Sequence, residues 1–141
     1  MSEVAFNSIL DGVSKALHAA FPPPVQVHGG GVKQGLKPGD FNLVMPTAGH
    51  TREVGHRYKR TPTVDVIYYP KRGAAECYDV AQRLTFILES ITTPEGDVIH
   101  GTISELTVQD GVLHVLVRYD HHIYIPQEQT AMETLRIEQE G

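Results

Sequence analysis

The chain has 141 residues, of which 40% are hydrophobic and 21% charged, and this is the size and composition of one globular domain with an apolar core. Its 12 Lys and Arg against 17 Asp and Glu give a formal net charge of -5, which argues against a general nucleic-acid-binding protein because phosphate neutralisation supplies most of that affinity. The absence of a run of about 18 apolar residues and of a leader pattern, together with a lone Cys77, leads us to expect a soluble protein that folds in a reducing cytoplasm.

The first element predicted is a helix over residues 2–20. Its apolar side chains recur at the three-and-four spacing of a helix with one buried face, as in Phe6, Ile9, Leu10, Val13 and Leu17. Three consecutive prolines, Pro22 to Pro24, remove backbone donors and should end the helix at Phe21. A short strand over residues 25–28 is expected next.

Two alternating segments, residues 41–45 and 64–68, predict strands that Pro46 and Pro70 should end. The polar stretch between them, residues 47–60, carries four cations against Glu53, a local charge of +3 in an acidic protein. We expect it to form a long hairpin arm.

The second predicted helix carries an apolar stripe from Cys77 to Ile91 and should be terminated by Pro94 and Gly96. Two extended segments, residues 98–108 and 112–125, follow and are joined by Asp110-Gly111, a dipeptide typical of tight hairpins. In the second segment the odd-numbered residues from Leu113 to Ile125 should face the core and the even-numbered ones solvent.

These elements predict one α+β domain over residues 1–125, with a mostly antiparallel sheet of five or six strands and both helices packed on one face. Residues 126–141 form a polar, acidic C-terminal tail in which Leu135 and Ile137 alternate with charged residues like a short strand. We expect this tail to be an arm between subunits.

The eight histidines are the obvious candidates for metal binding or general base catalysis. His121 and His122 are adjacent and should point to opposite faces of a strand, while His114 and His122 share a face but lie on the order of 26 Å apart. Cys77 lies on the apolar stripe of a helix, where a thiol is inert. We therefore expect no catalytic, metal-binding or cofactor-binding residues and no enzymatic activity.

The segment Arg57-Tyr58-Lys59-Arg60 interleaves an aromatic ring with cations, a combination that can grip a single nucleic-acid strand. The same residues also fit a protein interface, or a strand edge that charge protects from unwanted pairing. The residues themselves leave these three interpretations open.

Several segments in order, from about residue 30 to 125, resemble the tail terminator proteins of tailed phages and of prophages in Gram-positive hosts. The resemblance rests on Lys33-Gln34-Gly35, Gly55 to Arg60, Val64 to Pro70, Glu76 to Ala81, Ile99 to Thr102, Asp110 to His114 and Val117 to Tyr119. The chain departs from the family's usual helix-to-strand joint at the triplets Pro22 to Pro24 and Gly29 to Gly31.

The resemblance implies a structural virion protein, assembled in the host cytoplasm, that forms a hexameric ring on the tail tube. Such a ring ends tube polymerisation and offers a surface for head-tail joining, so its partners are other copies, the tube protein and a neck or head-completion protein. It implies neither a membrane nor a sequence-specific nucleic acid as a partner. Another neck or head-completion protein is the alternative within this class, and a small metal-dependent hydrolase or a nucleic-acid-binding module is the alternative outside it.

Ring closure needs two different, complementary surfaces on each subunit. The basic segment and the acidic tail provide opposite charges, so we hypothesise that the arm of one subunit meets the tail of the next. The residues expected at this contact are Arg57, Lys59 and Arg60 on the arm and Glu133, Leu135 and Ile137 on the tail.

Overall fold

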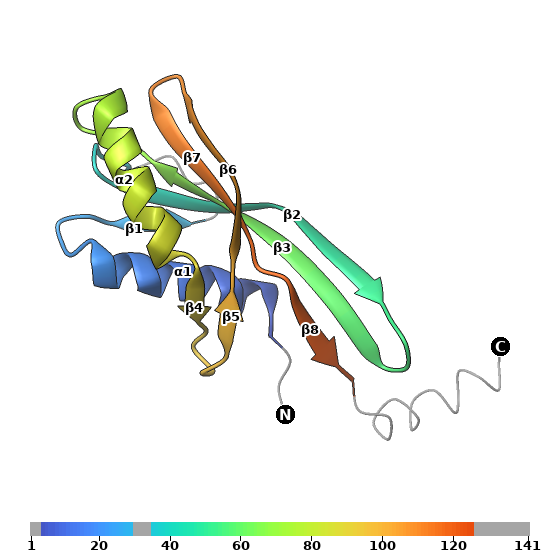
Figure 1. Cartoon of the computed structure of the whole chain (residues 1–141). Coiled ribbons are helices and arrows are strands. Elements are labelled where there is room, and N and C mark those ends of the chain that lie inside the picture. Colours follow the sequence, from blue (N-terminus) through green and yellow to red (C-terminus); the bar gives the residue numbers. More distant parts are fainter. Residues whose placement is uncertain (1–3, 30–34, 126–141) are drawn as a thin grey trace.

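The computed structural model describes residues 4–29 and 35–125 (Figure 1). They form two helices, α1 (Phe6–Ala20) and α2 (Ala74–Ile87). They also form eight strands: β1 (Val27–Gly29), β2 (Phe41–Arg52), β3 (Arg57–Tyr68), β4 (Ser90–Thr92), β5 (Val98–His100), β6 (Thr102–Gln109), β7 (Val112–Arg118) and β8 (His121–Tyr124).

The main sheet has the strand order β1-β2-β3-β7-β6, and β1 is its only parallel member within the described residues. Strand β3 pairs with β7 along its second half and with β8 along its first half. Strands β4 and β5 form a separate two-stranded sheet. The predicted α+β class with a mostly antiparallel sheet is therefore confirmed, although there are more strands than the five or six expected.

Both helices pack on the same face of the sheet, α1 against β1 and β2 and α2 against β6 and β7 (Figure 1). Side chains from paired positions of the three central strands, such as Leu43, Val66 and Val115, meet α1 and α2 in one hydrophobic core. Burying each such side chain contributes about 1.5–3 kcal/mol, so this shared core holds the two layers together.

The predicted central hairpin is confirmed. Asp110 and Gly111 both have positive φ, 54° and 75°, as a two-residue hairpin turn requires. The predicted core face of the second strand of this hairpin is correct, because Leu113, Val115 and Val117 are fully buried. The C-terminal strand expected around Leu135 and Ile137 lies outside the described residues.

The prediction that Pro46 ends a strand is wrong, since β2 runs through it to Arg52. The pairing of β2 with β3 shifts register between Val44 and Thr47, so Pro46 lies in a bulge. Strand β1 pairs with only the first three residues of β2. Beyond them β2 is an edge strand, so the sheet does not need the backbone N–H that Pro46 lacks.

The second helix ends earlier than predicted, at Ile87 rather than after Ile91. The carbonyl of Leu88 accepts a hydrogen bond from the buried Tyr119 hydroxyl at 2.8 Å, and Ile91 is instead a buried residue of β4. The segments expected at 98–108 and 112–125 are each divided in two, into β5 and β6 and into β7 and β8. Helix α1 begins at Phe6 and β1 spans Val27–Gly29, within a few residues of their predicted bounds.

Candidate functional site

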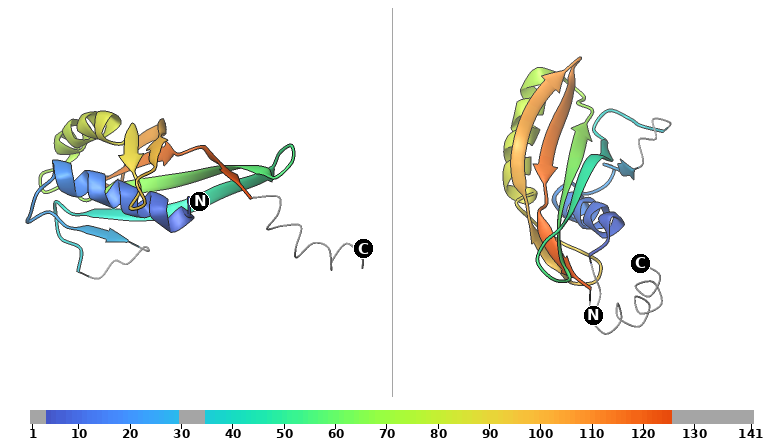
Figure 2. Two further views of the ribbon diagram at one scale, coloured as in Figure 1. Left: turned by 90° about the horizontal axis from the view of Figure 1, so that it is seen from below. Right: turned by 90° about the vertical axis from the view of Figure 1, so that its right-hand side faces the viewer.

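The outer halves of β2 and β3 form a hairpin that extends beyond the helices (Figure 2, left). We call its residues 47–62 the arm, and β8 pairs with the β3 side of it. The turn at its tip contains Gly55 with φ of 72°, a conformation that favours glycine. The hairpin arm predicted from the polar stretch is thus confirmed.

Arg57 and Lys59 lie on one face of the arm. They pair in register with Tyr124 and His122 of β8, so these four side chains share that face, which we call the flank face. Arg57 Nε lies 3.3 Å from Glu53 Oε1, and His122 Nε2 lies 3.3 Å from the same oxygen. The flank face is therefore a basic surface with one acidic residue at its centre.

Arg60 lies on the opposite face and is held by the body of the protein. Its guanidinium donates to the Val4 carbonyl oxygen at 3.2 Å and to His50 Nδ1 at 3.1 Å, and stacks 4.7 Å from the centre of the Phe6 ring. The structure brings Arg57 and Lys59 together but separates Arg60 from them. Arg60 ties the base of the arm to the start of α1.

The predicted tail residues Glu133, Leu135 and Ile137 lie outside the described residues. The pairing of the arm with the tail accordingly stays a prediction.

Two carboxylates, the buried Asp40 and the half-buried Glu76, organise the opposite end of the molecule. Asp40 accepts hydrogen bonds from the backbone N–H groups of Gln26 and Lys37, each at 3.1 Å, and pairs with His28 Nε2 at 3.1 Å. Although burial alone would raise its pKa, these hydrogen bonds and the charge of His28 hold the pKa of Asp40 below its usual value. The partners of the Asp40 carboxylate all belong to the chain itself, so its role is to hold the loop before β2 in place.

Glu76, at the start of α2, has the same kind of role. It accepts hydrogen bonds from the Tyr68 hydroxyl and from the backbone N–H groups of Lys71 and Arg72. Burial raises its pKa, but these bonds outweigh burial and the net pKa of Glu76 is lowered. Glu76 thus ties the start of α2 to the end of β3 and to the chain that joins them.

Three histidines pair with an acid in the described residues, and no group of three or more His, Cys, Asp or Glu lies close enough to hold a metal ion there. His114 pairs with Asp65 at 3.0 Å. His121, predicted to be a core histidine, is 9% exposed and its Nδ1 lies 3.0 Å from the Tyr119 carbonyl oxygen, while its Nε2 has no partner among the described residues. Cys77 is fully buried as predicted, and burial raises the pKa of its thiol.

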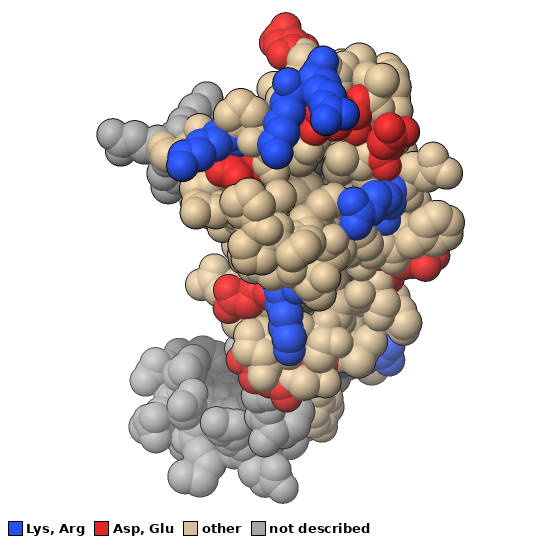
Figure 3. All heavy atoms as spheres, turned by 90° about the vertical axis from the view of Figure 1, so that its left-hand side faces the viewer, with Lys and Arg blue, Asp and Glu red and all other residues tan. Residues whose placement is uncertain are grey.

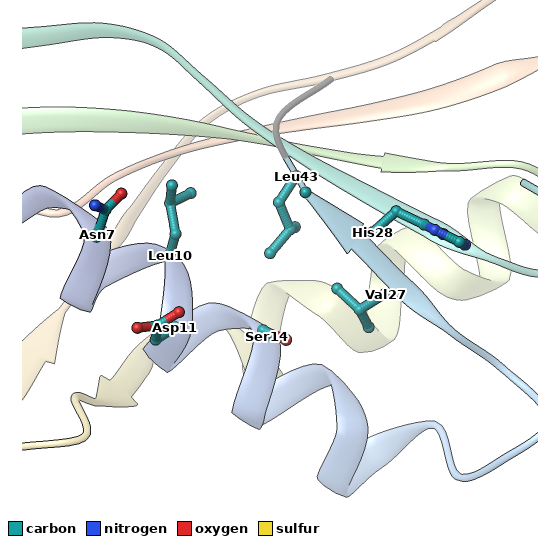
Figure 4. A pocket seen from close by; sticks show the side chains of 8 residues that line it. Asn7, Leu10, Asp11, Ser14, Val27, His28 and Leu43 are labelled. Carbon is teal, nitrogen blue, oxygen red and sulfur yellow. The ribbon is translucent and has the colours of Figure 1, made fainter. Parts of the chain in front are cut away.

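A cleft of about 290 Å³ lies between α1 and β1 (Figure 4). Leu10, Val27 and Leu43 form its apolar part, and Asn7, Asp11 and Ser14 project from α1 along it. Asp11 and His28 come from opposite sides, and His28 is already engaged by Asp40.

Charge is mixed rather than gathered on the end of the molecule opposite the arm. There Lys and Arg side chains lie among Asp and Glu side chains (Figure 3). A nucleic-acid-binding surface would instead concentrate cations along a continuous path. In the described part of the chain, no helix is long and apolar enough to cross a membrane.

A family model described as phage tail terminator protein matches residues 8–131, which is most of the chain. The chain belongs to the phage tail terminator family. No curated protein matches it significantly. One solved structure resembles it with a TM-score of 0.46 and 18% sequence identity, covering 89% of this chain and 100% of the other.

Membership of this family makes the chain a structural component of the phage tail that interacts with other tail components. The resemblance noted from sequence segments between residues 30 and 125 is confirmed. Sequence reasoning missed the binding of Arg60 to the start of α1, because no pattern in the sequence marks Phe6 as the partner of a cation 54 residues away. It also missed the pairing of β8 with the arm, because nothing in residues 112–125 marks a change of partner strand.

Proposed function

We propose that this tail terminator forms a ring, of six copies, that caps the tail tube, ends tube polymerisation and provides the surface for head-tail joining. The observation that supports this proposal is a one-domain body with an arm projecting from one side of it, in a chain of the tail terminator family. An arm and a body surface are different patches, so their contact is head-to-tail and can repeat around a closed ring.

The flank face of the arm is the part we assign to contact with a neighbouring copy. Arg57 and Lys59 lie there, and the tail of the chain, with Glu133, Leu135 and Ile137, has the opposite charge. Charges at the rim of an interface govern association rate and salt sensitivity more than final affinity. Arg57→Glu combined with Lys59→Glu should therefore weaken self-association most at low salt, measured by sedimentation velocity.

Arg60→Glu serves as the contrast to this pair of substitutions. It removes contacts with Val4 and Phe6 inside one subunit, so it should lower the melting temperature of the monomer. Deleting residues 127–141 should weaken self-association at every salt concentration, because it removes apolar side chains as well as charge. Self-association that is unchanged by this deletion would contradict a role for the tail.

The function itself is tested by inactivating the gene in a phage or inducible prophage that carries it. Loss of a terminator should leave tubes of irregular, extended length and heads without attached tails in electron micrographs, and the wild-type gene supplied in trans should restore both. Tails of normal length joined to heads in the inactivated phage would refute the proposal.

A further inference from the structure

A groove lies between α2 and the edge strand β6, on the body of the protein. Its apolar lining comes from Tyr78, Ala81, Leu106, Val108 and Leu113, and its volume is about 400 Å³. Tyr78 is 62% exposed and Leu106 45% exposed, and neighbouring Phe86 is 73% exposed. Exposed apolar side chains gathered around a groove mark a contact surface more often than scattered ones do.

The tip of the arm carries the complementary feature. Val54 is 92% exposed, the most exposed of the large apolar side chains in the described residues. It lies in the hairpin turn between β2 and β3, with Arg52 and Arg57 on the strands beside it. Because the Val54 side chain packs against almost nothing in its own subunit, it does not contribute to the stability of that subunit.

The tip and the groove lie at opposite ends of one molecule. In Figure 1 the groove elements α2 and β6 are at the upper left, and the β2–β3 turn is at the lower right. The arm of a subunit therefore points away from its own groove and toward the position of a neighbour. A contact between two such separated patches is heterologous, the kind that forms rings.

Acidic residues lie next to the groove, and cations outnumber acids at the arm tip. Asp79 directly follows the groove residue Tyr78, and Asp110 lies in the turn between β6 and β7. Both acids are exposed, and neither forms an ion pair with a described residue. The tip brings Arg52 and Arg57 against Glu53. Opposite charge around an apolar contact steers association and fixes its orientation.

We infer that the arm tip of one copy docks in the α2–β6 groove of the next, with Val54 inserted among Tyr78, Leu106 and Val108. This inference rests on the proposed ring and names the contact that closes it. The occupant of the groove is a second copy of this chain. The flank face of the same arm stays available for the tail.

Point substitutions test the contact in the full-length protein by sedimentation velocity over a range of concentrations. Val54→Asp and Leu106→Glu should each raise the dissociation constant of the assembly by about 10- to 100-fold, the value of one buried valine or more. Val98→Asp is the matched control, because Val98 is 57% exposed on β5 and lies outside both patches. All three variants should melt at the wild-type temperature. If Val54→Asp assembles as tightly as Val98→Asp, the inference is overturned.

A cysteine pair tests the same contact by position. Val54→Cys combined with Leu106→Cys should give disulfide-linked oligomers on mild oxidation, while Val54→Cys with Val98→Cys should not. The native Cys77 is fully buried and should not interfere. If the wild type is a monomer at every concentration and the first pair gives no cross-link, the inference fails.

The outcomes also separate this inference from the proposed function. Failure of both the substitutions and the cross-link, with overlong tails in the gene-inactivated phage, removes the groove contact and leaves the terminator function standing. Normal tails in that phage remove the function whatever the cross-link shows.

Discussion

Gly101→Ala is a test of how tightly the body that carries the arm is packed. Gly101 lies where β5 passes to β6, against Tyr119 and the backbone of Leu88. A Cβ at residue 101 would stand 2.8 Å from the Leu88 carbonyl oxygen and 2.9 Å from Tyr119 Cδ1, where nonbonded carbon atoms are usually about 3.5–4.0 Å apart. The fully buried Tyr119 ring and the backbone carbonyl cannot both move aside.

The expected loss of stability combines two effects of this overlap. Overpacking of a close-packed site costs about 1–3 kcal/mol, and displacement of the Tyr119 hydroxyl from the Leu88 carbonyl costs about 1 kcal/mol more. The free energy of unfolding should thus fall by about 2–4 kcal/mol, a large share of the roughly 5–15 kcal/mol of a typical domain. The melting temperature should fall by about 7–14 °C for a chain of this length.

Urea unfolding followed by circular dichroism measures this change. Gly29→Ala is the matched control, because a Cβ at Gly29 meets nothing within 4 Å and should leave the midpoint unchanged or slightly raised. Tyr119→Phe, which removes the hydroxyl alone, should cost about 1 kcal/mol. A Gly101→Ala protein that unfolds at the wild-type midpoint would show that Tyr119 is not packed as described.

Three further predictions concern the core and the start of α2. Val115→Asp should abolish cooperative folding, because an unpaired carboxylate would replace a fully buried side chain, and a soluble variant with a sharp melting transition would contradict the assigned strand face. The pKa of Glu76 in the folded protein lies below its ordinary value of 4.5. The stability that the ionised Glu76 contributes should therefore be complete above pH 4.5 and be lost as the pH falls through the folded pKa. Glu76→Gln should make stability depend less on pH in this acid range. Cys77 should react with a thiol reagent only as fast as the protein unfolds, so rapid reaction under native conditions would show that its helix face is open.

The sequence predicted the elements whose signal is local and repeated. The apolar stripe of α1, the alternation from Leu113 to Val117 and the Asp110-Gly111 turn each carry their own pattern, and all three are present. The arm was predicted from the polarity of the stretch after Pro46, and family membership from segments spread over most of the chain.

The misses occurred where tertiary contacts decide the outcome. Ile91 continues the helical stripe but belongs to β4, because the Tyr119 hydroxyl binds the carbonyl of Leu88 and helix α2 ends there. Pro46 did not end β2, because it lies at a bulge on an edge whose position depends on the shortness of β1. Arg60 resembled its neighbours Arg57 and Lys59 in sequence, and its contacts with the start of α1 distinguish it only in the folded chain.

Strand β3 is continuous from the body to the arm. It pairs with β7 in the body and with β8 in the arm. The exchange occurs at Pro62, whose carbonyl accepts the Tyr119 N–H between the last pair with β7 and the first pair with β8. Strand β2 also runs from the body into the arm, so the twist of the paired strands β2 and β3 sets the angle between them. In any head-to-tail assembly built through the arm, that angle fixes the rotation from each copy to the next. The backbone geometry around Pro62 then sets the number of copies in a closed ring. Substitutions at Pro62 should change the number of copies in the ring more than the affinity between them.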